Sequence, residues 1–584
     1  MPEIVLTTLN AKFSHAAFGL RYLFANLGEL QPRAAIAEFD INLRPLDIAE
    51  ALLAREPRIL GFGIYIWNVA QTTEVISAIR RVRPEIKIIL GGPEVSYETE
   101  GQKIVELADH VITGEADLKF AEVCRTLLAT KPFTLTLTPG EREQREKTAE
   151  TSETRLNQSA SGLEKDGNNI LPLPPGEGRG GGLPKIIAAE LPEFSRIALP
   201  YEYYTEADLA HRIVYVEASR GCPFTCEFCL SSLDIPVRQV PLETFLVAMQ
   251  RLMDRGLKQF KFVDRTFNLN IVSSKALLEF FLARHQPGMF YHFEMIPDRL
   301  PPELREVIAK FPPGSLQFEV GIQTFNPEVG SLISRRQNYE RMVDNFNYLR
   351  RETSVHIHAD LIVGLPGETL ESFAAGFDQL IALGPQEIQV GILKRLRGTP
   401  IIRHDAEWQM VYNAHPPYEM LQNKLLTFAT MQRLRRFARY WDLVGNSGNF
   451  VAVAPLMWSA VGRDSVEPKP IPENQIRAQG TFAPPPRASA FHSFLCFSDW
   501  LYAKIHRTDS IALARLMQLL FEFLTQERKL EPKLVAATFW QDCQRTGRRD
   551  APNFLKEFLP EESWSVVRDR DRSLPKRQSR HQAA

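Results

Sequence analysis

The sequence has few cysteines, no long apolar run and almost no net charge. Six cysteines among 584 residues are too few for a disulfide-rich secreted protein. No apolar run reaches the ~18–20 residues of a membrane-spanning helix, and the N-terminal residues lack the basic and apolar regions of a signal peptide. The net charge of -1 provides no field that favours nucleic acid. We therefore expect a cytoplasmic protein whose partners include neither a membrane nor a nucleic acid.

The chain does have enough apolar content for more than one folded core. Hydrophobic residues make up 44% of it and charged residues 24%, and a chain of this length is expected to form two or three domains. Composition and periodicity divide it into a doubly wound (Rossmann-like) α/β domain at 1–130, a disordered linker at 131–190, a partial barrel at 191–400, a mainly helical domain at 401–567 and a disordered tail at 568–584.

Short apolar strands alternate with amphipathic helices in the first domain. We expect strands at 4–8, 35–40, 59–65, 86–91 and 110–113, with helices between them at 18–30, 47–54, 72–81 and 101–107. This repeated order predicts a parallel sheet with helices on both faces. Because ligands bind such sheets beyond the carboxyl ends of the strands, the residues that follow these strands are candidate binding residues.

The linker and the tail lack apolar periodicity. Segment 139–166 is charged and rich in Ser and Thr, and segment 171–183 is rich in Pro and Gly. These segments have too few apolar residues to offset the entropy lost on ordering. The C-terminal tail is polar and basic, and we expect it to be frayed.

A second strand–helix series predicts a barrel. Its expected strands lie at 213–218, 259–263, 290–294, 316–321, 356–363 and 387–392, and its helices at 242–255, 273–284, 302–311 and 339–352. Six such units favour a partial (β/α)6 TIM-like barrel, and a second open sheet is the alternative. After Pro400 the pattern is mainly helical, with expected helices at 418–437 and 512–530.

Half of the cysteines lie within eight residues, directly after the first strand of the second series. They are Cys222, Cys226 and Cys229, in the pattern C-x-x-x-C-x-x-C. Soft thiolates at this spacing suit an iron–sulfur cluster or zinc. Because no fourth cysteine lies nearby, one metal position stays open, as in catalytic sites. A zinc loop or a chance cluster is the alternative. The remaining cysteines are expected to be buried thiols: Cys124, Cys496 and Cys543.

The segment from Ser219 to Cys229, with Phe228 before the last cysteine, resembles the signature of the radical SAM superfamily. The resemblance implies that the three cysteines hold three irons of a 4Fe-4S cluster, while the fourth iron chelates S-adenosylmethionine (SAM). One electron from the reduced cluster would then cleave SAM and release a 5′-deoxyadenosyl radical. The resemblance also implies an electron donor such as flavodoxin or ferredoxin.

By the same resemblance, groups at the ends of the later barrel strands contact SAM. The residues at these strand ends are Asp264, Glu294, Glu319, Gln323 and Gly364, and Phe228 of the cysteine loop is a further expected SAM contact. The Gly-Gly-Glu motif often found after the second strand is replaced here by Asp264-Arg265-Thr266. Each of the carboxylates could instead be a hydrogen-bonded structural group, and no residue is assigned a catalytic role.

The domain before the barrel is similar to that of the cobalamin-binding subclass of radical SAM enzymes. In that subclass, small residues after the strands let the corrin ring approach the backbone. The matching residues are Gly63, Gly91, Gly92, Gly114 and Glu115. The Asp-x-His-x-x-Gly motif of many corrinoid proteins is absent, so His15 is a conceivable cobalt ligand, with a polar loop histidine as the alternative. The alternative is a sheet domain that only covers the opening of the barrel and binds no cobalamin.

The resemblance implies a cobalamin-dependent methyltransferase that acts on an unactivated carbon of a small-molecule substrate. SAM would serve twice, once to methylate cobalamin and once to generate the radical. A radical cyclase or oxidative rearrangement enzyme with the same cofactors is one alternative, and a non-catalytic cobalamin or iron–sulfur sensor is another. An RNA-modifying enzyme would need a basic accessory domain that is not evident. The helical C-terminal domain resembles an uncharacterised domain that accompanies some members of this subclass.

Overall fold

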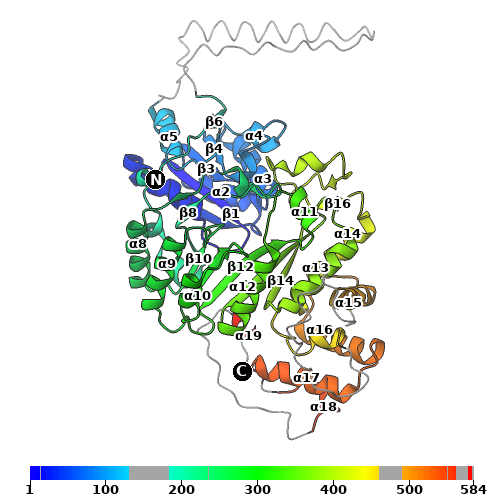
Figure 1. The fold of residues 1–584 in the computed structure, drawn as a ribbon. Helices are drawn as coiled ribbons and strands as arrows, with labels where there is room; N and C mark the ends of the chain where they lie inside the picture. The colour runs from blue at the N-terminus through cyan, green and yellow to red at the C-terminus, as the bar shows by residue number, and fades with distance from the viewer. Residues whose placement is uncertain are drawn as a thin grey trace, which may run out of the picture.

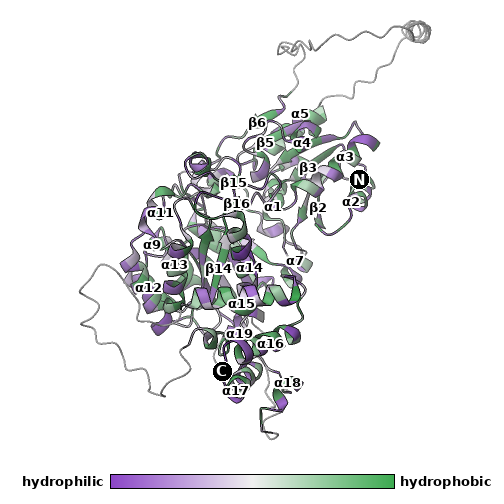
Figure 2. Ribbon diagram, turned by 90° about the vertical axis from the view of Figure 1, so that its right-hand side faces the viewer, coloured by the Kyte–Doolittle hydropathy of each residue, from purple (hydrophilic) through white to green (hydrophobic). Residues whose placement is uncertain are grey.

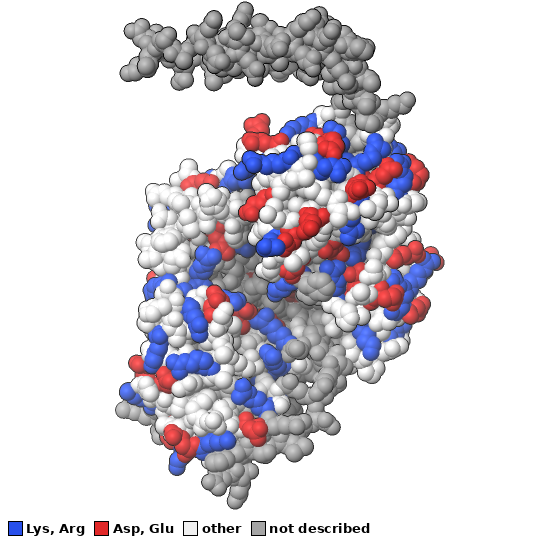
Figure 3. Space-filling model, turned by 180° about the vertical axis from the view of Figure 1, so that it is seen from behind, with Lys and Arg blue, Asp and Glu red and all other residues white. Residues whose placement is uncertain are grey.

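The computed structural model describes residues 1–12, 15–129, 183–234, 236–459, 489–548, 550–560 and 576–581. Two parallel sheets lie one above the other in Figure 1, and a helical region lies beside the second sheet. On the face shown in Figure 3, acidic and basic side chains are interspersed, as the net charge of -1 leads one to expect. Within the described residues, no helix is both long enough and apolar enough to cross a membrane.

The first sheet has six strands in the order β2-β1-β3-β4-β5-β6. Their bounds are β1 Ile4–Asn10, β2 Ala34–Asp40, β3 Ile59–Gly63, β4 Lys87–Gly91, β5 His110–Thr113 and β6 Ile186–Ala188. Strand β1 is buried along its whole length, as expected for a strand covered on both faces. The covering helices are α1 Phe18–Ala25, α2 Pro45–Leu53, α3 Val69–Val82, α4 Lys103–Leu107 and α5 Lys119–Ala129. The predicted doubly wound sheet is confirmed.

Strand β6 corrects the predicted linker. The linker was expected to be disordered through residue 190, but residues 186–188 pair in parallel with β5. Pairing satisfies backbone groups of β5 that would otherwise form an open edge, so even this short segment gains hydrogen bonds on ordering. Linker residues 131–182 lie outside the described residues.

The second sheet also has six parallel strands, in the sequential order β7-β10-β11-β12-β13-β14. Their bounds are β7 Val214–Val216, β10 Gln259–Phe262, β11 Phe290–Met295, β12 Leu316–Gln323, β13 His356–Val363 and β14 Glu387–Ile392. The helices between them are α8 Leu242–Asp254, α9 Ile271–Ala283, α10 Pro302–Ile308, α11 Pro327–Leu332, α12 Tyr339–Glu352 and α13 Leu370–Leu383. Among the described strands β14 does not pair with β7. The arrangement is the predicted partial barrel.

Buried ion pairs join the two sheets through helix α7 (Glu206–His211), which precedes β7. The guanidinium of Arg21 lies 2.9 Å from Glu38 and 2.7 Å from Asp208. Arg212 also reaches Glu38, at 2.7 Å. Because Arg21 and Glu38 belong to the first domain whereas Asp208 and Arg212 lead into the barrel, these pairs fix one sheet against the other.

The C-terminal region is mainly helical, as predicted. Its elements are η6 Pro400–His404, the hairpin β15 Val411–Tyr412 and β16 Met420–Gln422, then α14 Phe428–Val444, α15 Ala490–Ile505, α16 Leu513–Glu522, a π-helical turn Phe523–Glu527, α17 Pro532–Arg545 and α18 Asn553–Lys556. In Figure 2, apolar and polar residues alternate along these helices. The helix expected from residue 418 begins instead at Phe428, because the Thr427 side chain caps it and residues 420–422 pair with β15. Cys496 is exposed rather than buried.

The predicted disordered tail contains a docked helix, α19 (Lys576–His581). Arg577 lies 3.0 Å from the buried carboxylate of Glu387, at the start of β14. Gln578 donates a hydrogen bond of 2.7 Å to Gln317 on β12. A buried carboxylate needs a cation or hydrogen-bond donors, and this requirement orders a segment that composition alone marks as frayed. Residues 568–575 and 582–584 lie outside the described residues.

Candidate functional site

The three clustered cysteines lie on a loop at the carboxyl end of β7, closed at its base by a short antiparallel pair. Strands β8 (Ser219–Arg220) and β9 (Arg238–Gln239) form this base. Gly221 begins the loop with φ +89°, and a Cβ there would lie 2.7 Å from the carbonyl oxygen of Asp234. The same carbonyl accepts a 3.0 Å hydrogen bond from the Cys222 amide. Glycine therefore lets the loop close tightly before its first cysteine.

The thiols of this loop fit a 4Fe-4S cluster by their chemistry. Cys222 and Cys226 are buried, and Cys229 is half-buried. Burial raises the pKa of Cys222, so bound iron or a nearby cation is needed to favour its thiolate. Arg335 supplies such a cation, with Nη1 3.4 Å from Cys226 Sγ. In the described residues, no three His, Cys, Asp or Glu side chains converge on one metal ion, whereas a cubane cluster takes each thiolate on a different iron.

Glu227, between two of the cysteines, ties the loop to two other parts of the chain. Its amide donates to the carbonyl of Ile333, and its carboxylate accepts from the Ser334 hydroxyl, both at 3.0 Å. On the other side, Nε2 of His404 lies 2.9 Å from its second oxygen, and the Ile401 amide donates to its carbonyl. The sequence analysis missed this residue. Its place between two candidate metal ligands was the available signal, because a carboxylate there that does not bind the metal needs another hydrogen-bond partner.

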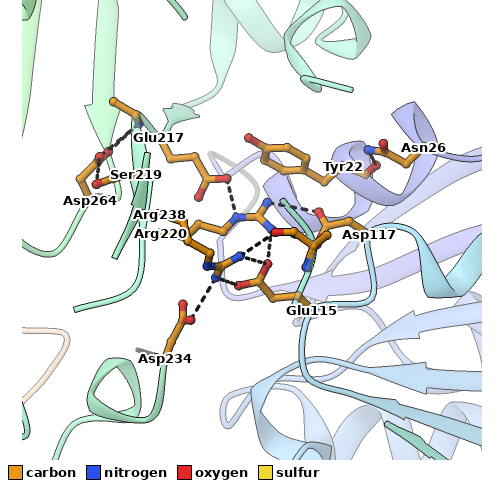
Figure 4. Close-up of polar contacts among 12 residues, drawn as sticks. Tyr22, Asn26, Glu115, Asp117, Glu217, Ser219, Arg220, Asp234, Arg238 and Asp264 are labelled. Atoms are coloured by element: carbon orange, nitrogen blue, oxygen red, sulfur yellow. Dashed lines mark hydrogen bonds and ion pairs between the residues drawn. The ribbon is translucent and has the colours of Figure 1, made fainter. Parts of the chain in front are cut away.

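A buried network ties the base of the loop to the first domain (Figure 4). Arg220 donates to Glu115 at 3.0 Å and to Asp117 at 2.9 Å, and its Nε donates to Glu217 at 2.8 Å. Arg238 donates to the same Glu115 carboxylate, also at 3.0 Å. Burial tends to raise the pKa of Glu115, but the two guanidinium groups outweigh it and lower that pKa. Glu115, which the sequence placed at the cobalamin site, thus forms ion pairs with the barrel domain.

Asp264 follows β10 and contacts the chain just before the cysteine loop. It accepts hydrogen bonds from the Ala218 amide, at 3.0 and 3.1 Å, and from the Ser219 hydroxyl, at 2.7 Å. Full burial raises its pKa to about 7, although these donors oppose the shift. These contacts hold the chain just before the loop, and a contact between Asp264 and SAM stays a prediction.

Glu294 and Glu319 lie opposite one another in register on β11 and β12, so both side chains point to the same face of the sheet. Glu294 pairs with Arg265 at 2.9 Å. Glu319 lies 3.1 Å from Nε2 of His292. Burial opposes ionisation of Glu319, but its hydrogen bond with His292 and the positive charge nearby hold its pKa well below the usual range. The two predicted carboxylates are therefore brought together, each with a cationic or histidine partner.

Gln323 lies beside Arg335, the residue that reaches Cys226. Gln323 ends β12 with φ +72°. A Cβ added to Gly321 would lie 2.5 Å from the side-chain nitrogen of Gln323 and 3.5 Å from Arg335 Nη2. The side chains of Gln323 and Arg335 therefore both lie over Gly321. Phe228 is partly buried and packs against the barrel core, and its contact with SAM stays a prediction.

Gly364 has a packing explanation. It follows β13 with φ +93°, and a Cβ there would lie 3.2 Å from Met420 and 3.4 Å from Met431. The C-terminal region thus covers the backbone at this strand end. Whether Gly364 also approaches SAM stays a prediction.

In the first domain the predicted glycines lie at the carboxyl ends of β3, β4 and β5. Gly92 has φ +107°, and a Cβ there would lie 2.5 Å from the carbonyl oxygen of Ile64. The Gly63 carbonyl accepts from the Thr8 hydroxyl at 2.7 Å, and the Gly114 amide donates to the Ser96 hydroxyl at 3.3 Å. Gly91 ends β4, and its carbonyl accepts a hydrogen bond from the Ile64 amide at 2.8 Å. These glycines permit close backbone packing at the sheet edge where such folds bind ligands.

His15 lies against the barrel. It forms a bridge with Ile213, and its Nδ1 contacts the hydroxyl of Tyr215 on β7. Burial, with Lys261 nearby, lowers its pKa. The imidazole therefore already has a partner in the second domain, which agrees with a structural role and leaves cobalt ligation a prediction.

The loop after β4 contacts the chain after β14. Glu94 accepts from the Tyr418 hydroxyl at 2.5 Å and pairs with Arg397 at 2.9 Å. Glu98 pairs with Arg395 at 3.0 Å. Since Glu115 follows β5 and meets Arg220 after β7, the carboxyl ends of both sheets face the same interface. Sequence patterns could not show these pairs because each joins residues far apart in the chain.

Three family models match segments of the chain. They are the Radical SAM superfamily at residues 216–380, the B12 binding domain at 4–124 and a protein of unknown function, DUF4080, at 406–464. The cysteine loop falls inside the first match, and Glu115 falls inside the second.

Individual proteins are similar to parts or all of the chain. An uncharacterized methyltransferase of Pyrococcus horikoshii is 24% identical over 365 residues, covering 61% of this chain and 71% of that one. The ribosomal protein uS12 methylthiotransferase RimO of Pelobacter propionicus is 26% identical over 197 residues, covering 32% of this chain and 43% of that protein. The structure of the cobalamin-dependent SAM radical enzyme OxsB with aqua-cobalamin bound aligns with a TM-score of 0.54 at 11% identity, over 97% of this chain and 85% of that one. At this identity the alignment shows a shared fold.

Proposed function

We propose that this chain, a radical SAM superfamily protein with a B12-binding domain, methylates an unactivated carbon atom of a small-molecule substrate. Its cofactors are a 4Fe-4S cluster, SAM and cobalamin. One observation carries the proposal: the three-cysteine loop lies where the carboxyl ends of the two sheets face each other. The P. horikoshii protein, named a methyltransferase, supports the choice of reaction.

The chain's own residues supply binding, charge and enclosure. When bound, the cluster and cobalamin supply the one-electron cleavage of SAM and the carrier for its methyl group. Cys222, Cys226 and Cys229 would hold three irons of the cluster. Arg335, 3.4 Å from Cys226 Sγ, offsets part of the thiolate charge. The burial of Cys222 and Cys226 keeps water from two of the ligands.

The arrangement of the domains suits a reaction shared by two cofactors. The β4 and β5 ends of the B12-binding domain touch the segments that follow β14 and β7 of the barrel. A methyl group carried at the first sheet would therefore lie near the barrel opening, where a substrate could meet both cofactors. An electron donor such as flavodoxin or ferredoxin would reduce the cluster.

The test compares anaerobically purified wild-type protein with Cys226→Ala and with Cys496→Ala, an exposed cysteine on α15. We expect wild type and Cys496→Ala to contain iron, sulfide and cobalt, and to release 5′-deoxyadenosine from SAM when dithionite is added. Cys226→Ala should lose the cluster absorption and SAM cleavage, because one iron loses its thiolate.

SAM labelled in its methyl group decides the reaction class. Label transferred into a product supports methylation, whereas 5′-deoxyadenosine without transferred label favours a cyclase or rearrangement. Wild-type protein that binds the cofactors but never cleaves SAM would be a sensor. Tightly bound zinc in place of iron would contradict the assignment.

A further inference from the structure

Two arginines face each other at the base of the cysteine loop. Arg220 on β8 and Arg238 on β9 are direct partners in the antiparallel register, at the two ends of the chain segment that carries the cysteines. Like charges placed directly opposite on a strand pair destabilise the pairing. The base of the loop therefore needs acidic partners before it can close.

The acidic partner shared by both arginines comes from the B12-binding domain. Glu115 accepts hydrogen bonds from Arg220 and from Arg238, in each case at 3.0 Å, and Asp117 accepts two more from Arg220, at 2.9 and 3.2 Å. The side chains of these four residues are at most 17% exposed. Ion pairs so shielded from water are stronger than surface pairs. Without Glu115, Arg238 would keep only Asp234, 3.0 Å away and 31% exposed, as an acidic partner among the described residues.

Further contacts keep Arg220 in one position (Figure 4). Its guanidinium lies 4.4 Å from the ring centre of Tyr22. It also lies 5.2 Å from the ring centre of Phe194. Its Nε donates to Glu217, which follows β7. Because Arg220 is followed directly by Gly221 and Cys222, a guanidinium held by two domains also sets where the first cysteine lies.

We propose that Glu115 is a positioning residue for the iron–sulfur cluster, through which the B12-binding domain completes the cluster-binding loop of the barrel. This inference rests on the proposed function, since it concerns the same three-cysteine site. Neutralising the facing arginines lets β8 and β9 pair, and their pairing holds Cys222 and the rest of the loop at the spacing that a cluster needs. The assigned role differs from that of a cobalamin contact, in which the side chain would face the corrin.

Glu115→Gln tests the inference, because it keeps the size of the side chain and removes its charge. We expect the variant to lose iron and sulfide after anaerobic reconstitution, and to lose the electron paramagnetic resonance signal of the reduced cluster, in the presence and absence of SAM. Cobalamin content, measured separately, should stay near that of the wild type. The milder Glu115→Asp should give an intermediate loss of iron and keeps the test valid if Glu115→Gln folds poorly.

Arg238→Gln and the double variant Glu115→Gln/Arg238→Gln test whether Glu115 acts by neutralising the two arginines. If Glu115 acts by neutralising the arginines, the double variant should lose no more iron than Glu115→Gln alone, because only one of the facing cations remains. Glu29→Gln is the matched control, since Glu29 pairs with Arg125 in an exposed ion pair that lies within the first domain and does not reach the barrel. It should retain the wild-type iron content.

The outcomes that overturn the inference are distinct. A Glu115→Gln protein that keeps its cluster signal, or losses that simply add in the double variant, would contradict the positioning role. Loss of cobalamin with retention of iron would show that Glu115 binds cobalamin instead. Wild-type protein that takes up no iron would contradict the proposed function together with this inference, whereas a cluster-bearing wild type with an unaffected variant contradicts the inference alone.

Discussion

Replacing Gly221 by alanine should damage the cysteine loop more than the same change at another glycine with the same backbone angle. Gly221 has φ +89° and Gly256, between α8 and β10, has φ +90°. A Cβ at Gly256 would meet nothing within 4 Å, whereas a Cβ at Gly221 would lie 2.7 Å from the Asp234 oxygen and 2.9 Å from the Pro236 oxygen. The pair therefore separates backbone strain from steric contact.

The expected magnitudes follow from these contacts. Alanine in a left-handed conformation costs about 1–2 kcal/mol, and both variants should show this loss. At Gly221 the Asp234 carbonyl must also move, which breaks the bond that it accepts from Cys222 and adds about 0.5–1.5 kcal/mol before any remaining clash. We expect Gly221→Ala to be destabilised by about 3 kcal/mol, or roughly twice the effect at Gly256.

Thermal unfolding and iron content measure the two consequences. For a cooperative unit of 150–250 residues, each kcal/mol corresponds to a shift of roughly 2–4 °C. Gly221→Ala should show the larger shift and should also bind less iron after reconstitution, while Gly256→Ala should bind as much as the wild type. Equal shifts in the two variants, or a full complement of iron in Gly221→Ala, would refute the reasoning.

Two further predictions concern buried carboxylates. The pKa of Asp264 is raised to about 7, so the folded state keeps a proton that the unfolded chain releases near pH 4. The free energy of unfolding, relative to that of Asp264→Asn, should therefore fall as the pH rises, by up to ~1.4 kcal/mol per pH unit between about pH 4 and 7. Unfolding curves across that range check this, and a pH-independent difference would contradict it. Burial tends to raise the pKa of Glu387, but His356 and Arg577 outweigh it and lower that pKa. Arg577→Ala should therefore cost about 1–2 kcal/mol near neutral pH, a loss that shrinks as the pH falls and Glu387 is protonated. Arg251→Ala, in an exposed ion pair, is the control and should have little effect on the same unfolding curves.

Much of the fold was predictable because its signals are local. The strands of both sheets are short apolar runs, and helices such as Tyr339–Glu352 have an apolar face at the expected spacing. The spacing of Cys222, Cys226 and Cys229, together with their place after a strand, was enough to predict an iron–sulfur or zinc site without reference to distant parts of the chain. Strand β6 and helix α19 could not be predicted in this way, since each is ordered by distant partners rather than by its own composition.

The sequence by itself therefore determined the types of element, their order and the cysteines that suit a cluster. Only the tertiary structure decided the partners of the charged residues: Glu115 meets Arg220 and Arg238 rather than facing solvent, and Asp264 accepts hydrogen bonds from the chain before the cysteine loop. The physical reason is that apolar periodicity and ligand spacing are properties of neighbouring residues, whereas the energy of a buried charge depends on which groups from elsewhere in the chain surround it.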